Sequence, residues 1–269
     1  MIDLSNIEMK EEKRQSSKGN QMKWLKDGLW YKADYTGYEG LAEYVVSTLI
    51  KTSNLAGDAY QLYETEQIQY QFAKYLGCKS KNFLPEGWQM ITLERLFMNT
   101  YGQSLNSSIY TIRNLEERVK FLIDQVKRIT GLEEFGKYIC NLMTIDALFL
   151  NEDRHTHNIA VLMDSEGHYR YCPIFDNGGC LLSDTTIDYP IGVGVEKLMR
   201  TVTAKTFCQS FDEQLDVAEA LYGHSLKFDF RVEDIEQILE DELYYPMEVK
   251  MRVLEILKEQ RRKYQYLFK

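Results

Sequence analysis

Asn151-Glu-Asp-Arg-His-Thr-His-Asn158 is the stretch that decides how this chain is interpreted. Two apolar runs follow it directly, Ile159–Met163 and Tyr169–Ile174. Asp164-Ser-Glu-Gly167 separates the two runs, and a polar turn that ends in Gly at such a place predicts a β-hairpin. Because a hairpin reverses the chain, we expect Phe175-Asp-Asn-Gly178 to return to the end of this region at which the first stretch lies.

Asp153 and Asn158 are five residues apart, which is the D-x-x-x-x-N spacing of kinase catalytic loops. In such loops the Asp accepts the proton of the acceptor hydroxyl and the Asn amide oxygen binds Mg²⁺. The spacing alone is a weak signal, but the hairpin adds Asp176 beside a Gly, where a kinase has a second Mg²⁺ ligand. Mg²⁺ prefers oxygen ligands, only a few of them from protein. We therefore expect Asp153 to act as a base, and Asn158 and Asp176 to bind the metal.

The segment 133–150 has the apolar periodicity of a helix, and one carboxylate, Asp146, falls within its apolar stripe. The stripe consists of Phe135, Ile139, Leu142 and Phe149. A carboxylate on a buried face needs hydrogen-bond partners because its desolvation is costly. We expect Asp146 to fix the following loop by accepting backbone N–H groups.

Asp27-Gly28 lies between the runs Met22–Lys26 and Leu29–Ala33, and an Asp-Gly pair in such a place is a strong hairpin signal. Lys32 falls on the second predicted strand, from which an ammonium can reach the α- and β-phosphates of a nucleotide. A solvated strand lysine is the alternative interpretation. Ser16-Ser-Lys-Gly-Asn20 precedes this hairpin, and we expect this polar segment, with Ser16, Ser17 and Gly19, to cover the phosphates.

A helix is predicted over residues 37–51. Thr36-Gly-Tyr-Glu39 has the Ser/Thr-x-x-Glu form of a capping box, and apolar residues follow it at helical spacing. Glu39 and Glu43 are both candidate ion-pair partners for Lys32. Since Glu39 has a local role in the capping box, Glu43 is the better candidate.

The remaining pattern divides the chain into two halves. Residues 60–76 and Met90–Leu93 suit short strands. The later segments are helical, at about 109–130, 133–150, 209–222, 233–242 and 247–266. We predict an α+β, bilobal, protein-kinase-like fold with a small β-rich N-lobe carrying one helix (1–93), a hinge (94–98) and a larger, mostly helical C-lobe (99–269).

Composition excludes several other classes. The chain has 32 Lys and Arg against 41 Asp and Glu among 269 residues, a net charge of −9, so a nucleic-acid partner is not expected. Its first thirty residues lack the apolar core of a signal peptide, and its most apolar stretch is too short to cross a bilayer. Five cysteines without a C-x-x-C pair are typical of reduced thiols. We expect a cytoplasmic protein that contacts no membrane.

With these residues in place, the chain resembles the HipA-like kinase family. Its Asp153-Arg-His-Thr-His-Asn158 is also similar to the D-R-H-x-x-N loop of phosphatidylinositol kinases. The match covers this loop, Pro173-Ile-Phe-Asp176, the strand of Lys32 and the helix of Glu43. The resemblance implies transfer of phosphate from ATP, with Mg²⁺, to Ser or Thr of a protein substrate.

The same resemblance implies roles for further residues. His155 would organise the loop or stabilise the transition state, and Met90–Leu96 would be the adenine hinge, with backbone groups near Glu94 and Leu96 binding the base. Kinases of this family often act as toxins paired with an antitoxin, and some phosphorylate a Ser of their own phosphate loop, here Ser16 or Ser17.

Two other function classes stay open at this point. A pseudokinase, which binds nucleotide as a regulatory module, is one; the complete set of Lys32, Asp153, Asn158 and Asp176 argues against it. A small-molecule or lipid kinase is the other, suggested by the D-R-H-x-x-N similarity, although a net charge of −9 disfavours a membrane substrate.

Overall fold

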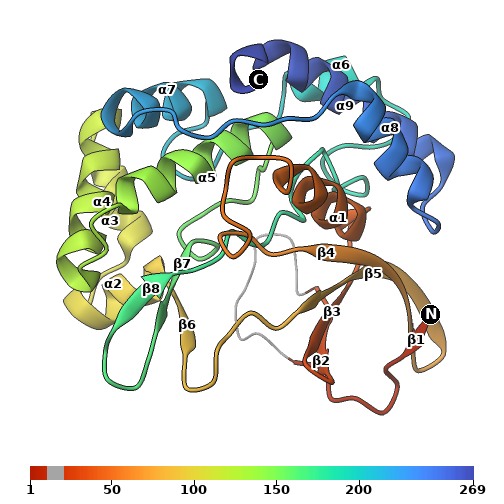
Figure 1. Cartoon of the computed structure of the whole chain (residues 1–269), viewed down its shortest axis with the longest axis horizontal. Helices are drawn as coiled ribbons and strands as arrows, with labels where there is room; N and C mark the ends of the chain where they lie inside the picture. The colour runs from red at the N-terminus through yellow and green to blue at the C-terminus, as the bar shows by residue number, and fades with distance from the viewer. Residues whose placement is uncertain (11–20) are drawn as a thin grey trace. The chain divides into compact units, whose positions relative to one another are not determined.

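The structure is a computed structural model that describes residues 1–10 and 21–269. These residues form two compact units, whose chain segments can be followed in Figure 1. The first unit consists of residues 1–82, 176–202 and 227–269, and the second of residues 83–175 and 203–226. The units divide the chain at other positions than the predicted hinge, and the lobes 1–93 and 99–269 stay a prediction.

A five-stranded sheet forms the centre of the first unit, with the order β1-β4-β5-β3-β2. Its strands are β1 (Ile2–Asp3), β2 (Lys23–Lys26), β3 (Leu29–Ala33), β4 (Tyr63–Tyr70) and β5 (Ala73–Lys81). The predicted hairpin at 22–33 is confirmed, because β2 and β3 pair across a turn in which Asp27 and Gly28 have φ of 51° and 75°. Such left-handed angles suit Asp and Gly.

The two faces of this sheet have different partners. One face carries a buried cluster of Leu4, Trp24, Tyr31, Ala33 and Ile68. Side chains alternate along a strand, so Lys32, between Tyr31 and Ala33, lies on the opposite face. Helix α1 (Glu39–Ile50) packs there against β4 and β5. The helix predicted at 37–51 is thereby confirmed.

Two glycines bring α1 close to the sheet. A Cβ atom on Gly40 of α1 would lie only 2.4 Å from the carbonyl carbon of Gly77 on β5, and a Cβ on Gly77 would lie 2.1 Å from the carbonyl oxygen of Lys32. The neighbouring atoms are backbone and cannot rotate away. The distance between α1 and the strand of Lys32 therefore depends on the absence of these two side chains.

Replacing Gly40 by Ala should lower the free energy of unfolding by about 1–3 kcal/mol, because the added methyl group must push α1 away from β5. Urea unfolding followed by circular dichroism measures this change. Gly57→Ala is the matched control, since nothing lies within 4 Å of a Cβ at Gly57. A Gly40→Ala protein as stable as the control would contradict this account of how α1 is seated.

Three helices and a short 3-10 helix complete the first unit: α6 (Val195–Met199), α8 (Val232–Asp241), α9 (Met247–Lys263) and η1 (Gln265–Leu267). Helices α6 and α8 pack against α9. The helices predicted at 233–242 and 247–266 are confirmed, although the last turn is a 3-10 helix. Helix α6 was not predicted. Buried polar contacts join this part to the start of α1, since Arg252 donates to Tyr38 Oη at 3.2 Å and Tyr245 donates to Asp34 at 2.7 Å.

The second unit is mostly helical. Its helices are α2 (Leu93–Tyr101), α3 (Leu105–Thr111), α4 (Leu115–Thr130), α5 (Phe135–Phe149) and α7 (Phe211–Tyr222). Helix α5 packs against α4 and α7 and is buried along most of its length. The single helix predicted at 109–130 is wrong in one respect: it is broken, because the side chain of Asn114 accepts the N–H of Glu117 and so begins α4.

A three-stranded sheet of order β6-β7-β8 lies in the same unit. It consists of β6 (Gln89–Thr92), β7 (Ala160–Met163) and β8 (Tyr169–Tyr171). The predicted hairpin after Asn158 is confirmed as β7 and β8, and β6 pairs with β7. In the described part of the chain, no helix is both long enough and apolar enough to cross a membrane.

Candidate active site

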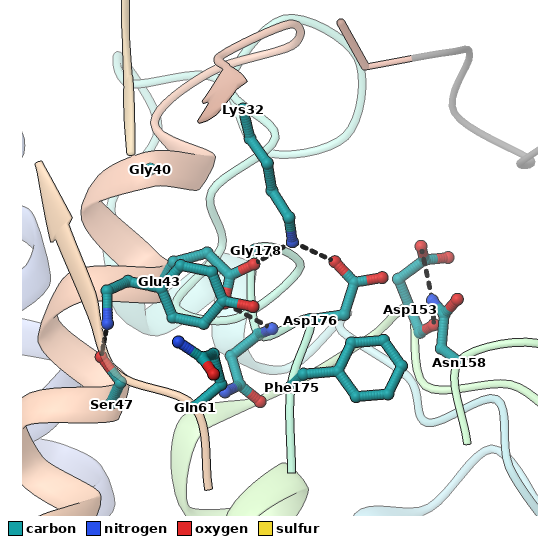
Figure 2. A network of polar contacts seen from close by, with 12 residues as sticks. Lys32, Gly40, Glu43, Ser47, Gln61, Asp153, Asn158, Phe175, Asp176 and Gly178 are labelled. Atoms are coloured by element: carbon teal, nitrogen blue, oxygen red, sulfur yellow. Dashed lines mark hydrogen bonds and ion pairs between the residues drawn. The ribbon is translucent and has the colours of Figure 1, made fainter. Parts of the chain in front are cut away.

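Lys32 lies in the first unit between two carboxylates (Figure 2). Its Nζ atom is 2.6 Å from Glu43 Oε1 and 2.9 Å from Asp176 Oδ1. Burial alone would lower the pKa of Lys32, but the charges of Asp176 and Glu43 hold that pKa well above its ordinary value. The ammonium of Lys32 is therefore the charged form at neutral pH. The predicted pairing of Lys32 with Glu43 is present, and the roles of these residues toward a nucleotide stay a prediction.

The predicted capping box does not form, because the N-cap of α1 is Tyr38 and no side chain caps the helix, but Glu39 has the predicted local role. The carboxylate of Glu39 turns back on the segment before α1 and accepts the N–H groups of Thr36 and Gly37, at 2.7 and 3.1 Å. The carboxylate of Glu43 instead faces the sheet and binds Lys32. Its second oxygen accepts the backbone N–H of Asn177 at 2.8 Å, so one side chain fixes both Lys32 and the segment that follows Asp176.

Asp176 has an unusual backbone conformation, with φ of 60°. Few residues other than Gly adopt the left-handed region, and Asp is among those that tolerate it. Such strained residues cluster at functional sites, where the surrounding structure enforces them. Here the enforcing contacts are the ion pair with Lys32 and the hydrogen bond from Asn177 to Glu43.

The loop with Asp153 and Asn158 lies in the second unit and is fixed by a buried ion pair. Arg154 Nε donates to both oxygens of Asp146, at 3.1 and 3.2 Å, and both side chains are almost fully buried. Arg154 Nη1 also donates to the carbonyl oxygens of Asn158 and Phe175. The expectation that Asp146 accepts backbone N–H groups is wrong, because the guanidinium of Arg154 takes that place and ties down the loop.

Asp153 and Asn158 contact each other directly. Asn158 Nδ2 donates to the carbonyl oxygen of Asp153 at 2.8 Å, which leaves the Oδ1 atom of Asn158 as the ligand that a metal ion would use. His155 Nε2 lies 3.8 Å from Asp153 Oδ1. The two side chains are about one-fifth exposed, so solvent reaches both. An amide oxygen such as Oδ1 of Asn158 is a hard donor of the kind that suits Mg²⁺.

Glu94 and Leu96 lie within α2, since Thr92 caps this helix by accepting the N–H of Arg95. Glu94 anchors the loop: its N–H donates to Thr156 O, and its carboxylate accepts the Thr156 hydroxyl at 2.9 Å. Leu96 is buried. Glu94 therefore holds the loop in place through Thr156, a role that the sequence did not indicate. Ser16, Ser17 and Gly19 lie outside the described residues.

The comparisons with known proteins concern the fold. No protein-family model matches the chain, and no curated protein matches it. The described residues have the α+β fold of kinases, as the sequence predicts. The crystal structure of the Helicobacter pylori proinflammatory kinase CtkA has this fold, with a TM-score of 0.65 and 18% identity over 97% of this chain and 95% of that one. At this identity the likeness establishes the fold alone.

Proposed function

We propose that this chain is an ATP- and Mg²⁺-dependent phosphotransferase, a HipA-like kinase that phosphorylates Ser or Thr hydroxyls of a protein. The observation that carries the proposal is the buried ammonium of Lys32 between Glu43 and Asp176. Kinases hold the nucleotide phosphates with a strand lysine that is paired to a helix glutamate. The kinase fold of the chain supports the same conclusion.

The phosphates are the part of ATP that Lys32 would bind. Its charge does not depend on pH in the working range, so it provides a permanent cation for the α- and β-phosphates. Asp176 and Asn158 Oδ1 would hold Mg²⁺, which would neutralise the charge of the nucleotide phosphates. Glu43 keeps Lys32 in place by binding its ammonium directly.

Asp153 is the base of the proposed reaction. Its carboxylate would accept the proton of the acceptor hydroxyl while the bond between that oxygen and the γ-phosphorus forms. His155, 3.8 Å from Asp153, would donate to a phosphoryl oxygen in the transition state. The rigid attachment of the loop through Arg154 keeps Asp153 in position, which is the main catalytic requirement in phosphoryl transfer.

The adenine base would bind along Met90–Leu96. Because the N–H of Glu94 is used by Thr156, we place the donors and acceptors for the base on β6. Strand β6 lies at the edge of its described sheet, with β7 on one side only, and such an edge presents backbone groups for binding. Ser16 or Ser17 remains the proposed autophosphorylation site, and an antitoxin or other regulatory protein the proposed partner.

The test is incubation of the full chain with [γ-³²P]ATP, Mg²⁺ and a bacterial lysate, followed by phosphopeptide mass spectrometry. We expect labelled Ser or Thr in lysate proteins and phosphate between residues 14 and 23 of the chain itself. Asp176→Asn should reduce the labelling at least ~100-fold, because it removes a charged Mg²⁺ ligand. Labelling that is no higher in the wild type than in this variant would refute a phosphotransferase.

The other outcomes identify the alternative classes. A melting temperature that ATP and Mg²⁺ raise without any turnover would indicate a pseudokinase. The similarity to the D-R-H-x-x-N loop favours a second candidate, a small-molecule or lipid kinase. Phosphorylation of a metabolite or phosphoinositide panel, with no protein labelled, would establish that candidate instead.

A further inference from the structure

Lys205 approaches the proposed base from a distant part of the sequence. Its Nζ atom lies 3.9 Å from Asp153 Oδ1, and His155 Nε2 lies 3.8 Å from the same oxygen. All three residues belong to the second unit. Oδ1 of Asp153 thus has two nitrogen atoms near it, from His155 and Lys205. The sequence motif contains only the histidine.

The backbone around Lys205 is firmly attached. The buried hydroxyl of Thr206 donates to the carbonyl oxygen of Arg154 at 2.7 Å, which ties the segment to the loop of Asp153. Tyr110 Oη donates to the carbonyl oxygen of Lys205 at 3.2 Å. The segment is therefore held from both the loop and α3, and the backbone position of Lys205 is set by the fold.

Stability does not explain this arrangement. The side chain of Lys205 is 37% exposed, and an exposed ion pair at 3.9 Å contributes little to the free energy of folding. Within residues 1–10 and 21–269, no acidic side chain other than Asp153 forms an ion pair with Lys205. A lysine ammonium has three N–H donors, so most of them are available to a second anion.

We infer that Lys205 binds the phosphoryl group while it is transferred, as a cation beside Asp153 in the second unit. This inference rests on the proposed phosphotransferase function. In the reaction the bond from the γ-phosphorus to the β,γ-bridging oxygen breaks and the bond to the acceptor oxygen forms. ADP keeps the electron pair of the broken bond, and Asp153 takes the acceptor proton. Negative charge on the transferred oxygens is then stabilised by Lys205.

The experiment compares Lys205→Met, Lys205→Arg and a matched control, Lys137→Met, which removes an exposed lysine of α5 in the same unit. Steady-state hydrolysis of Mg·ATP gives kcat and KM without an identified acceptor. We expect Lys205→Met to lower kcat about 100-fold with KM changed less than about threefold, the size of effect seen when one transition-state donor is removed. Lys205→Arg should retain most of the rate, and Lys137→Met all of it.

A binding measurement keeps the test independent of turnover. Isothermal titration calorimetry with Mg·ADP, alone and with aluminium fluoride as a probe for the transferred group, should show that Lys205→Met weakens only the aluminium fluoride complex, at least about tenfold. A merely structural role would weaken both complexes and lower the melting temperature.

Each other result decides against a stated claim. A kcat of Lys205→Met within twofold of the wild type overturns the inference, as does an increased kcat, which would make Lys205 a restraint on Asp153. Equal loss of both complexes overturns it as well. A wild-type rate no higher than that of the protein-free reaction refutes the phosphotransferase itself, and with it this inference.

Discussion

Replacing Asp153 by Asn should lower the rate of phosphoryl transfer by about 10²–10⁴-fold, which is the usual contribution of a general base. The amide has nearly the shape of the carboxylate, so the hydrogen bond from Asn158 to the Asp153 carbonyl oxygen is kept. Binding of Mg·ATP should change little, because Lys32, Asn158 and Asp176 remain. Single-turnover labelling at saturating ATP measures the rate, and calorimetry measures the affinity.

Glu166→Gln is the matched control for this experiment. It removes a negative charge from the exposed turn between β7 and β8 in the same unit and should leave the rate unchanged. If Asp153→Asn transferred phosphate as fast as the Glu166→Gln protein, Asp153 would not be the base, and the interpretation of the loop motif would have to be abandoned.

Replacing Arg154 by Met should destabilise the second unit by about 3–5 kcal/mol, because it leaves Asp146 as a buried charge without its partner. The two hydrogen bonds from Arg154 to the carbonyl oxygens of Asn158 and Phe175 are lost as well. Urea unfolding measures the change. The double variant Arg154→Met/Asp146→Leu should recover a large part of the loss, since it removes the stranded carboxylate.

The pH dependence of this loss follows from Asp146. Burial raises its pKa from 3.8 to about 6, although Arg154 opposes the rise. Because the folded state binds this proton more tightly, the contribution of Asp146 to stability decreases as the pH rises from about 4 to about 6. Without Arg154 the pKa of Asp146 rises further. The carboxyl group is then neutral at pH 5, whereas at pH 8 it is ionised and its buried charge destabilises the folded protein. The loss should be larger at pH 8, and equal losses at both pH values would contradict this explanation.

The sequence predicted those parts of the fold and site that depend on local patterns. The hairpin at Asp27-Gly28, helix α1 and the β7–β8 hairpin are each specified by residues adjacent in the chain. The choice of Glu43 over Glu39 followed from the capping box, and the structure has the same pairing. The class of fold followed from the order of these elements.

Contacts between distant residues were not predicted. Arg154 was read as part of a motif, but nothing in the motif indicates that it pairs with Asp146. Lys205 follows α6 in a segment with no recognisable pattern, and only the tertiary structure brings it to Asp153. The break before α4 was missed because one Asn outweighed a continuous apolar periodicity.

The first unit is assembled from three separate segments of the chain, so it cannot fold completely until the last of them has been translated. Its sheet and α1 leave the ribosome within the first 82 residues, but the contacts from Tyr245 and Arg252 to the start of α1 await the segment 227–269. At about 5–20 residues per second, translation of the intervening residues takes roughly 7–30 s. During this interval the second unit is completed while the start of α1 lacks its contacts with Tyr245 and Arg252. We expect nascent chains halted before residue 227 to bind chaperones, which would restrict any enzymatic activity to finished molecules.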